Sequence, residues 1–180
     1  KHGLHIMQPS VNNSATRFSY EKNNIYIGLS ALRDLGKASL PILDERKENG
    51  NYADFLDFVN RCRPGKKVLT ALAYSGAFDE FGISRHEIVE NTETVADYLG
   101  RVVRLDLNPF EEYPKKEKLQ LEYNYAGMYV SEHPLDEHIV AINVLEPAFI
   151  TDLIYEPDET EEVSYRSLRI KSKVIGILKD

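Results

Sequence analysis

The fold is decided by the stretch Gly-Leu-Ser-Ala-Leu-Arg-Asp-Leu-Gly-Lys-Ala-Ser-Leu-Pro-Ile-Leu at residues 28–43. Leu29 and Leu32 have helical spacing, and a second apolar series starts at Leu40. The break between the two series is too short for any loop except a tight hairpin. The stretch therefore predicts one or two helical turns, a hairpin centred on Gly36 and a second helix.

This hairpin has the features of an anion site. Gly36 lets the backbone come close to a ligand, and the first N–H groups of a helix have no partner within the helix. Pro41 falls in the first turn of the second helix, where a missing N–H costs little. A phosphate group is the obvious ligand for such a site.

Composition narrows the possible functions. The 180 residues are 42% hydrophobic and 28% charged, as in ordinary globular proteins. No apolar run is long enough to span a membrane, and no signal-peptide pattern is visible. Cys62 is the single cysteine and cannot form an internal disulfide, which suits a reducing compartment. The net charge of −7 argues against a generic basic DNA binder. The charge is unevenly distributed, however. Residues 1–104 contain 14 Lys and Arg and 13 Asp and Glu, whereas residues 105–180 contain 8 Lys and Arg and 16 Asp and Glu. DNA contacts are therefore expected in the first half of the chain.

The rest of the chain predicts a mainly α fold with a small β part. A β-hairpin is expected over 17–27, and a second helix–break–helix unit is expected around 76–82. The two units share one small core of five helices, the last of which is predicted over 84–100 from a capping-box pattern at Ser84. Beyond it we expect an extended segment at 104–110, helices near 115–133 and 136–144, and strands at 148–155 and 164–178.

These motifs, in this order, resemble the alpha subunit of bacterial DNA polymerase III, of the DnaE type. The likeness rests on 28–36 together with Asp54-Phe55-Leu56-Asp57-Phe58, Ser75-Gly76-Ala77-Phe78-Asp79 and Tyr129-Val130-Ser131-Glu132-His133-Pro134-Leu135. It implies the end of the fingers region with the β-hairpin at 1–27, a tandem helix-hairpin-helix DNA-binding domain at 28–102, a candidate clamp-binding segment at 103–114, a helical linker at 115–146, and the start of an OB-fold region, with incomplete strands, at 147–180.

The resemblance implies that the chain is a piece of a longer DNA-directed DNA polymerase that uses magnesium and deoxynucleoside triphosphates. The catalytic carboxylates would lie upstream, so the piece itself is expected to hold no catalytic residue, metal or cofactor. Its expected partners are duplex DNA, bound without sequence preference, the sliding clamp and other replisome subunits. Its expected location is the bacterial cytoplasm, away from membranes.

The expected DNA contacts are phosphate contacts from the two hairpin units and from the basic run between them. They are Arg33, Leu35, Gly36, Lys37 and Ala38, then Arg61, Arg63, Lys66 and Lys67, then Ser84 and Arg85. Asp34 stands where helix-hairpin-helix loops often carry a second glycine, and we expect it to point away, to cap the next helix or to weaken binding. The alternatives are an ordinary helical corner and a solvated charge run.

The segment after Arg104 resembles the clamp-binding peptides of bacterial polymerases. Its expected clamp contacts are Arg104, Leu105, Asp106, Leu107 and Phe110. It departs from that pattern because Arg104 replaces a glutamine and Asn108-Pro109 separates Leu107 from Phe110. The alternative is a linker that packs its leucines on its own domain.

Two other classes of function remain open. One is a protein-interaction module in which the hairpins are purely structural. The other is a free-standing nuclease, which the sequence disfavours because the acidic run at 156–162 lacks the rigid scaffold that metal-dependent phosphoryl transfer needs. His133 and His138 have no convincing third ligand, so no metal site is expected.

Overall fold

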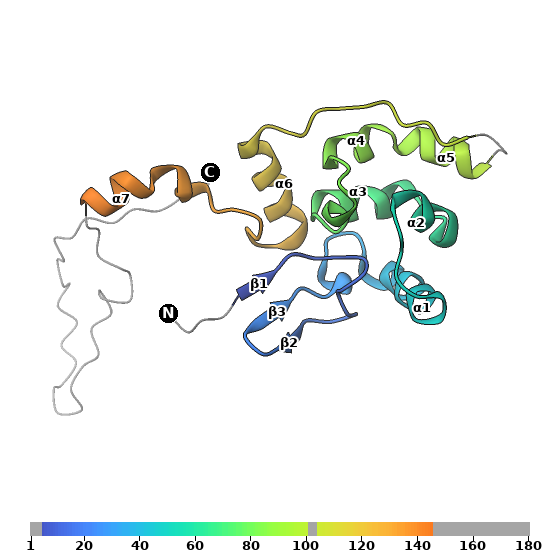
Figure 1. Cartoon of the computed structure of the whole chain (residues 1–180), viewed down its shortest axis with the longest axis horizontal. Helices are drawn as coiled ribbons and strands as arrows, with labels where there is room; N and C mark the ends of the chain where they lie inside the picture. Colours follow the sequence, from blue (N-terminus) through green and yellow to red (C-terminus); the bar gives the residue numbers. More distant parts are fainter. Residues whose placement is uncertain (1–4, 101–103, 146–180) are drawn as a thin grey trace, which may run out of the picture. The chain divides into compact units, whose positions relative to one another are not determined.

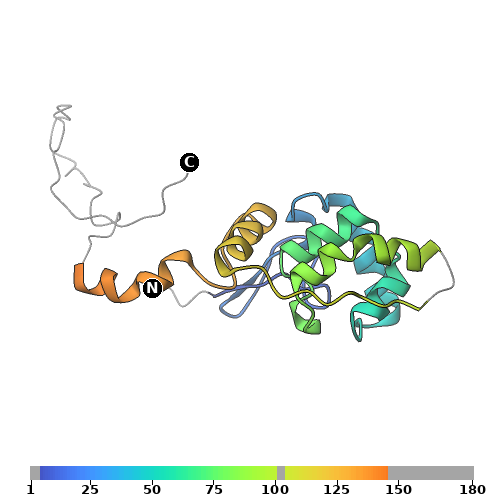
Figure 2. The same ribbon diagram turned by 90° about the horizontal axis from the view of Figure 1, so that it is seen from above.

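The computed structural model describes residues 5–100 and 104–145, which form two compact units (Figures 1 and 2). The first unit extends to Glu132 and the second begins at His133. The strands predicted at 148–155 and 164–178, and with them the OB-fold region, lie outside the described residues. The prediction of a mainly α fold with a small β part is confirmed.

A small sheet opens the first unit, with strands β1 (His5–Met7), β2 (Ser19–Glu21) and β3 (Asn24–Tyr26) in the order β1-β3-β2. β2 and β3 form the predicted antiparallel hairpin, and Lys22 between them has a φ of 55°. β1 pairs in parallel with β3, a pairing that the sequence did not predict. Its three residues are too few to show an alternating pattern.

The decisive stretch forms two short turns and a helix. A single 3-10 turn, η1 (Leu29–Ala31), is followed by η2 (Gly36–Ala38) and by α1 (Ser39–Asn49), which ends at Gly50 with a φ of 81°. Three leucines of this stretch, Leu29, Leu32 and Leu35, are buried. They anchor the hairpin on the core and leave its tip outside.

The remaining helices of the domain are α2 (Phe55–Cys62), α3 (Lys66–Tyr74), η3 (Asp79–Phe81), α4 (Arg85–Glu90) and α5 (Thr92–Gly100). The prediction of one helix over 84–100 is wrong, because the helix divides at Asn91. The buried Asn91 side chain donates to the carbonyl of Glu87 and also bonds the backbone of Asn108. Side-chain bonds of this kind compete with the helical ladder and favour a break.

One core joins these elements. Phe78 makes edge-to-face contacts with Phe55 and Phe58, at ring-centroid distances of 5.3 and 4.9 Å. Val11 and Ile27 from the N-terminal part are fully buried in the same cluster. The sheet and the helix-hairpin-helix helices therefore belong to one compact unit.

An extended segment at 104–114 runs back along α5 and α4 to α6 (Lys115–Ala126), as Figures 1 and 2 both show. α6 ends at Gly127, which has a φ of 80°. The second unit contains η4 (Pro134–His138) and α7 (Ile139–Leu145). Among the described helices, none has the length and apolar character needed to cross a membrane.

Candidate nucleic-acid interface

The first hairpin presents a rigid, exposed tip. Gly36, Lys37 and Ala38 are exposed, and Gly36 has a φ of 42°. The Ser39 hydroxyl donates to the Gly36 carbonyl at 2.7 Å, and the Ala38 N–H donates to the Leu35 carbonyl at 2.8 Å. The tip is therefore held by its own backbone from below while its outer side faces solvent.

Two backbone donors at this tip are available to a ligand. Within the described part of the chain, the N–H groups of Gly36 and Lys37 donate no hydrogen bond to the protein. The Ala38 N–H is already used, and the Leu35 N–H donates to the Leu32 carbonyl at 3.2 Å. Of the four hairpin residues predicted to bind phosphate through their backbone, Leu35 to Ala38, only Gly36 and Lys37 therefore keep an N–H group available for it.

The charges around the tip favour an anion, with one exception. Lys37 is exposed and takes part in no ion pair among the described residues. The Arg33 side chain is 65% exposed, and its backbone N–H donates to the Tyr125 carbonyl at the end of α6. Asp34 has a φ of 63°, caps no helix and places a carboxylate oxygen 3.9 Å from Arg33 Nε. Asp34 therefore offsets part of the Arg33 charge and leaves Lys37 as the stronger attraction.

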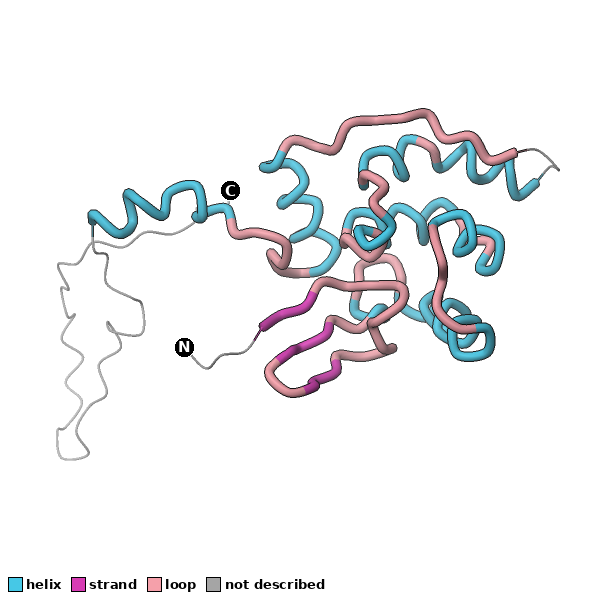
Figure 3. Tube along the Cα trace, viewed as in Figure 1, coloured by secondary structure: helices cyan, strands magenta, loops and turns pink. Residues whose placement is uncertain are grey.

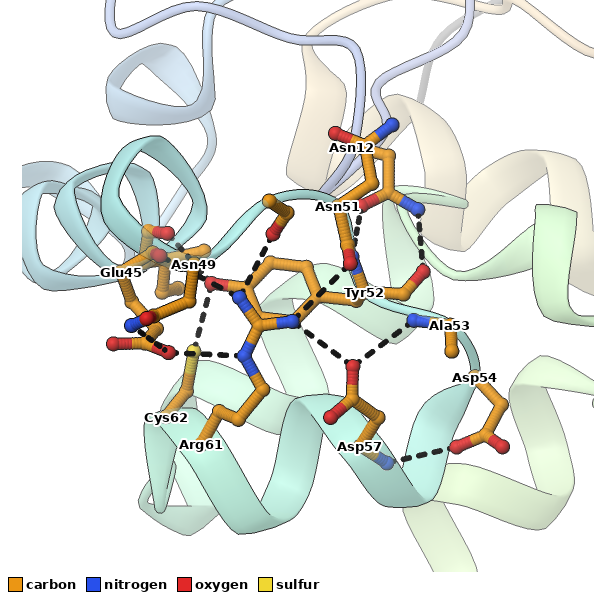
Figure 4. Close-up of polar contacts among 12 residues, drawn as sticks. Asn12, Glu45, Asn49, Asn51, Tyr52, Ala53, Asp54, Asp57, Arg61 and Cys62 are labelled. Carbon is orange, nitrogen blue, oxygen red and sulfur yellow. Dashed lines mark hydrogen bonds and ion pairs between the residues drawn. The ribbon is translucent and has the colours of Figure 1, made fainter.

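Arg61 is a structural residue and is not free for DNA (Figure 4). Its guanidinium lies between Glu45 and Asp57, at 2.9 and 3.0 Å, and 4.4 Å from the centre of the Tyr52 ring. It also donates to the Gly50 carbonyl at 2.8 Å. The hydrogen bond to Glu45, more than that to Asp57, raises the pKa of Arg61. These contacts hold α2 against α1, so Arg61, one of the four charges of the predicted basic run, is not available to bind a phosphate.

The other three charges of the basic run stay exposed. Arg63 has a φ of 45° and donates to the Leu99 carbonyl at 2.7 Å, near the end of α5. Lys66 pairs with Glu93 at 2.6 Å, although both side chains are mostly exposed. Lys67 is exposed and has no ion pair in the described structure. Lys67 is therefore the least committed of the three.

In the second hairpin unit, Arg85 is buried, which excludes it as a surface contact. Only 1% of the residue is exposed, and its guanidinium pairs with Asp79 at 2.7 Å and with Glu122 at 3.1 Å. Burial would lower the pKa of Arg85, but Asp79 and then Glu122 hold it above its ordinary value. Gly76 has a φ of 82°, and a Cβ there would lie 2.2 Å from Nε2 of Gln8 and 2.4 Å from Nη2 of Arg85, so another residue would strain the backbone and displace both side chains.

The backbone donors of this second unit are occupied as well. The Ser84 hydroxyl accepts from the Glu87 N–H, as its capping-box pattern predicted, and donates to the Phe110 carbonyl, both at 2.9 Å. The Glu112 carboxylate accepts from the N–H groups of Arg85 and His86, both at 3.3 Å. Burial would raise the pKa of Glu112, yet its backbone hydrogen bonds and Lys118 hold it below the usual carboxyl value. A carboxylate of the protein thus lies where a phosphate was expected.

The candidate clamp-binding segment is docked on its own domain. Leu105 and Leu107 are half-buried against the core. The Asn91 amide exchanges two hydrogen bonds with the Asn108 backbone, at 2.8 and 2.9 Å. The Phe110 ring is 37% exposed and lies 5.1 Å from the His86 ring, while Arg104 and Asp106 are exposed. This packing agrees with the alternative to clamp binding, in which the segment is a linker that packs its leucines on its own domain.

Glu122 is the main residue that the sequence analysis missed. It is fully buried in α6, where it binds Arg85 and also accepts from the N–H groups of Val130 and Ser131. Its position three residues after Leu119 and four before Ala126, on the apolar face of a helix, was the available signal. No described group of three or more His, Cys, Asp or Glu is placed to hold a metal ion.

The comparisons agree with this geometry. Residues 3–88 match the family model described as "Helix-hairpin-helix motif". The fold and the first hairpin thus define a helix-hairpin-helix protein. The chain is 32% identical over 160 residues to DNA polymerase III subunit alpha of Staphylococcus aureus strain Mu50, a match covering 78% of the chain and 15% of that relative. Against the same subunit of Staphylococcus epidermidis strain RP62A, identity is 32% over 149 residues, 74% of the chain and 14% of the relative.

The chain therefore belongs to the family of the DNA polymerase III alpha subunit. It spans about 15% of the length of the curated relatives that it matches.

Proposed function

We propose that this chain holds duplex DNA, without reading its base sequence, as part of a replicative DNA polymerase. The observation that carries the proposal is the exposed tip of the first hairpin, within the helix-hairpin-helix match. There the ammonium group of Lys37 lies beside two backbone N–H groups that have no hydrogen-bond partner among residues 5–100 and 104–145. Contacts to phosphate position a protein on DNA but carry no sequence information. Such a grip suits an enzyme that must act on any sequence.

In this proposal one phosphate accepts hydrogen bonds from the N–H groups of Gly36 and Lys37. The Lys37 ammonium neutralises that phosphate, and Arg33 adds a weaker contact because Asp34 offsets its charge. Lys67, Arg63 and Lys66 are the remaining candidates for phosphate contacts. The second hairpin unit contributes packing, because its donors and Arg85 bind groups of the protein.

Template-directed DNA synthesis is proposed for the whole polymerase, with deoxynucleoside triphosphates and magnesium as its substrates and metal. Among the described residues, no group of three or more His, Cys, Asp or Glu is placed to hold such a metal. A place in the replisome of a bacterial cytoplasm follows from the same family membership and belongs to the same proposal.

Attachment to a sliding clamp through 104–110 is a separate part of the proposal. Peptides that bind such partners use apolar anchors, and here Leu105 and Leu107 are half-buried against the domain core. Clamp binding therefore requires this segment to leave α4 and α5, which lowers its apparent affinity. If the segment stays docked, the alternative of a structural linker holds.

The proposal is tested by fluorescence anisotropy with two short duplexes of unrelated sequence. The variant is Lys37→Glu, and Lys47→Glu is its matched control because Lys47 is also exposed and lies ten residues further along, near the end of α1. We expect equal affinity for the two duplexes, and a loss of at least about tenfold for Lys37→Glu alone, since the reversal replaces attraction of the phosphate by repulsion. Equal losses in both variants would point to a general charge effect and contradict a hairpin grip.

A further inference from the structure

One face of the N-terminal sheet carries exposed apolar and aromatic side chains. Tyr20 is 64% exposed, Phe18 is 51% exposed and Ile6 is 47% exposed. Tyr20 and Ile6 are the two register partners of Ile25 on the middle strand, so the three side chains form a row on one face. Phe18 lies two residues before Tyr20, one residue ahead of β2, so the alternation of an extended chain predicts the same face for its ring, and Figure 3 shows β2 as an outer strand of the sheet.

The turn that follows Tyr20 supplies a positive charge beside this face, because Lys22 is exposed and directly precedes the middle strand's turn residue Asn23. Glu21 is the one acidic residue within the three described strands, and side-chain alternation places it on the opposite face from Tyr20. The aromatic face therefore suits a partner that combines flat rings with negative charge.

We propose that this face binds the unpaired bases of single-stranded DNA. Bases stack on aromatic side chains whatever their identity, and exposed aromatic residues on a sheet are a recurrent platform for them. Side chains two residues apart on a strand are about 6.6–6.8 Å apart, so Phe18 and Tyr20 present two separate rings to two successive unstacked bases. Lys22 contacts a neighbouring phosphate.

This site is distinct from the first hairpin, and neither needs the other to bind. The two are nevertheless connected within one unit, because the Leu29 and Ser30 N–H groups donate to the Ala15 and Thr16 carbonyls at 2.9 and 3.0 Å. These bonds tie the start of the hairpin stretch to the segment that leads into β2.

The test uses the full chain with a labelled oligothymidine and an abasic strand of the same length. We expect tighter binding of oligothymidine, a loss of about fivefold or more in Tyr20→Leu, and retention in Tyr20→Phe, because phenylalanine keeps the ring. Met7→Ala, on the opposite face of the sheet and 36% exposed in the wild type, is the control and should bind as the wild type does. Far-UV circular dichroism checks that each variant is folded.

Equal binding of the two strands, or an unchanged affinity in Tyr20→Leu, would overturn the proposal and leave a protein partner as the occupant of this face. Duplex affinity is measured on the same variants. Tyr20→Leu should retain it, so a failure of this site is distinguishable from a failure of the hairpin grip.

Discussion

Arg85→Met removes the guanidinium that lies between Asp79 and Glu122. Glu122 is fully buried, and the Arg85 contact at 3.1 Å compensates its charge. Breaking a buried ion pair from one side costs about 3–5 kcal/mol, because the remaining charge is left without a partner. Folded domains are stable by only about 5–15 kcal/mol, so this variant should lose a large part of its free energy of unfolding.

Urea denaturation followed by far-UV circular dichroism measures this loss. Arg63→Met is the matched control, because Arg63 is exposed and its loss should cost about 0.5 kcal/mol or less apart from its single bond to the Leu99 carbonyl. Adding Glu122→Gln to Arg85→Met should recover much of the stability, because the buried charge is then gone while the amide oxygen still accepts from the Val130 and Ser131 N–H groups. A loss below about 1 kcal/mol in Arg85→Met, with weakened DNA binding, would refute the structural role and restore the surface role predicted from the sequence.

Three further predictions concern the packing around the second hairpin unit. Gly76→Ala should destabilise the domain by about 2–3 kcal/mol, because its Cβ collides with Gln8 and Arg85, whereas Gly82→Ala, with a similar positive φ and open space, should cost about 1 kcal/mol in thermal or urea unfolding. The pKa of Glu112 is lowered on folding, so its contribution to docking of the 104–113 segment is full above the ordinary carboxyl pKa and is lost as the pH falls through the lowered value. Protection of the Arg85 and His86 amides from hydrogen exchange, taken relative to the intrinsic rate at each pH, should fall in that acidic range, and Glu112→Gln should remove this pH dependence. Asn91→Ala should speed amide hydrogen exchange over 104–110, because the Asn91 side chain holds the Asn108 backbone. If this segment is the clamp peptide, the same variant should bind the clamp more tightly. Slower or unchanged exchange would show that the Asn91 amide does not hold the segment.

Much of the fold was predictable because its determinants are local. The hairpin at Gly36 and the end of α1 at Gly50 follow from glycines with positive φ. The start of α4 follows from a local N-cap, because the Ser84 hydroxyl accepts from the N–H of Glu87, three residues further along. The pairing of β1 with β3 was not predictable, since it joins residues about twenty positions apart through three-residue strands without a pattern.

The site was predicted less accurately than the fold, because a sequence shows which residues are charged but not which of them are buried. Arg85 was predicted at the surface, but its buried partner Glu122 lies 37 residues further along the chain. The Arg61 ion pair was partly predictable, because Asp57 lies one helical turn before Arg61 and residues four apart on a helix can pair. Glu112, which fills the second hairpin, reaches α4 only through the course of the extended segment.

The central claim is that the first hairpin holds phosphate through Lys37, and the salt dependence of duplex binding tests it most directly. Each phosphate contact contributes about 0.9 to the slope of log K against log salt concentration. Lys37→Ala should lower the slope by about 0.9 relative to the wild type, and Lys47→Ala should leave it unchanged. A wild-type slope near zero, or the same slope in Lys37→Ala as in the wild type, would contradict the claim.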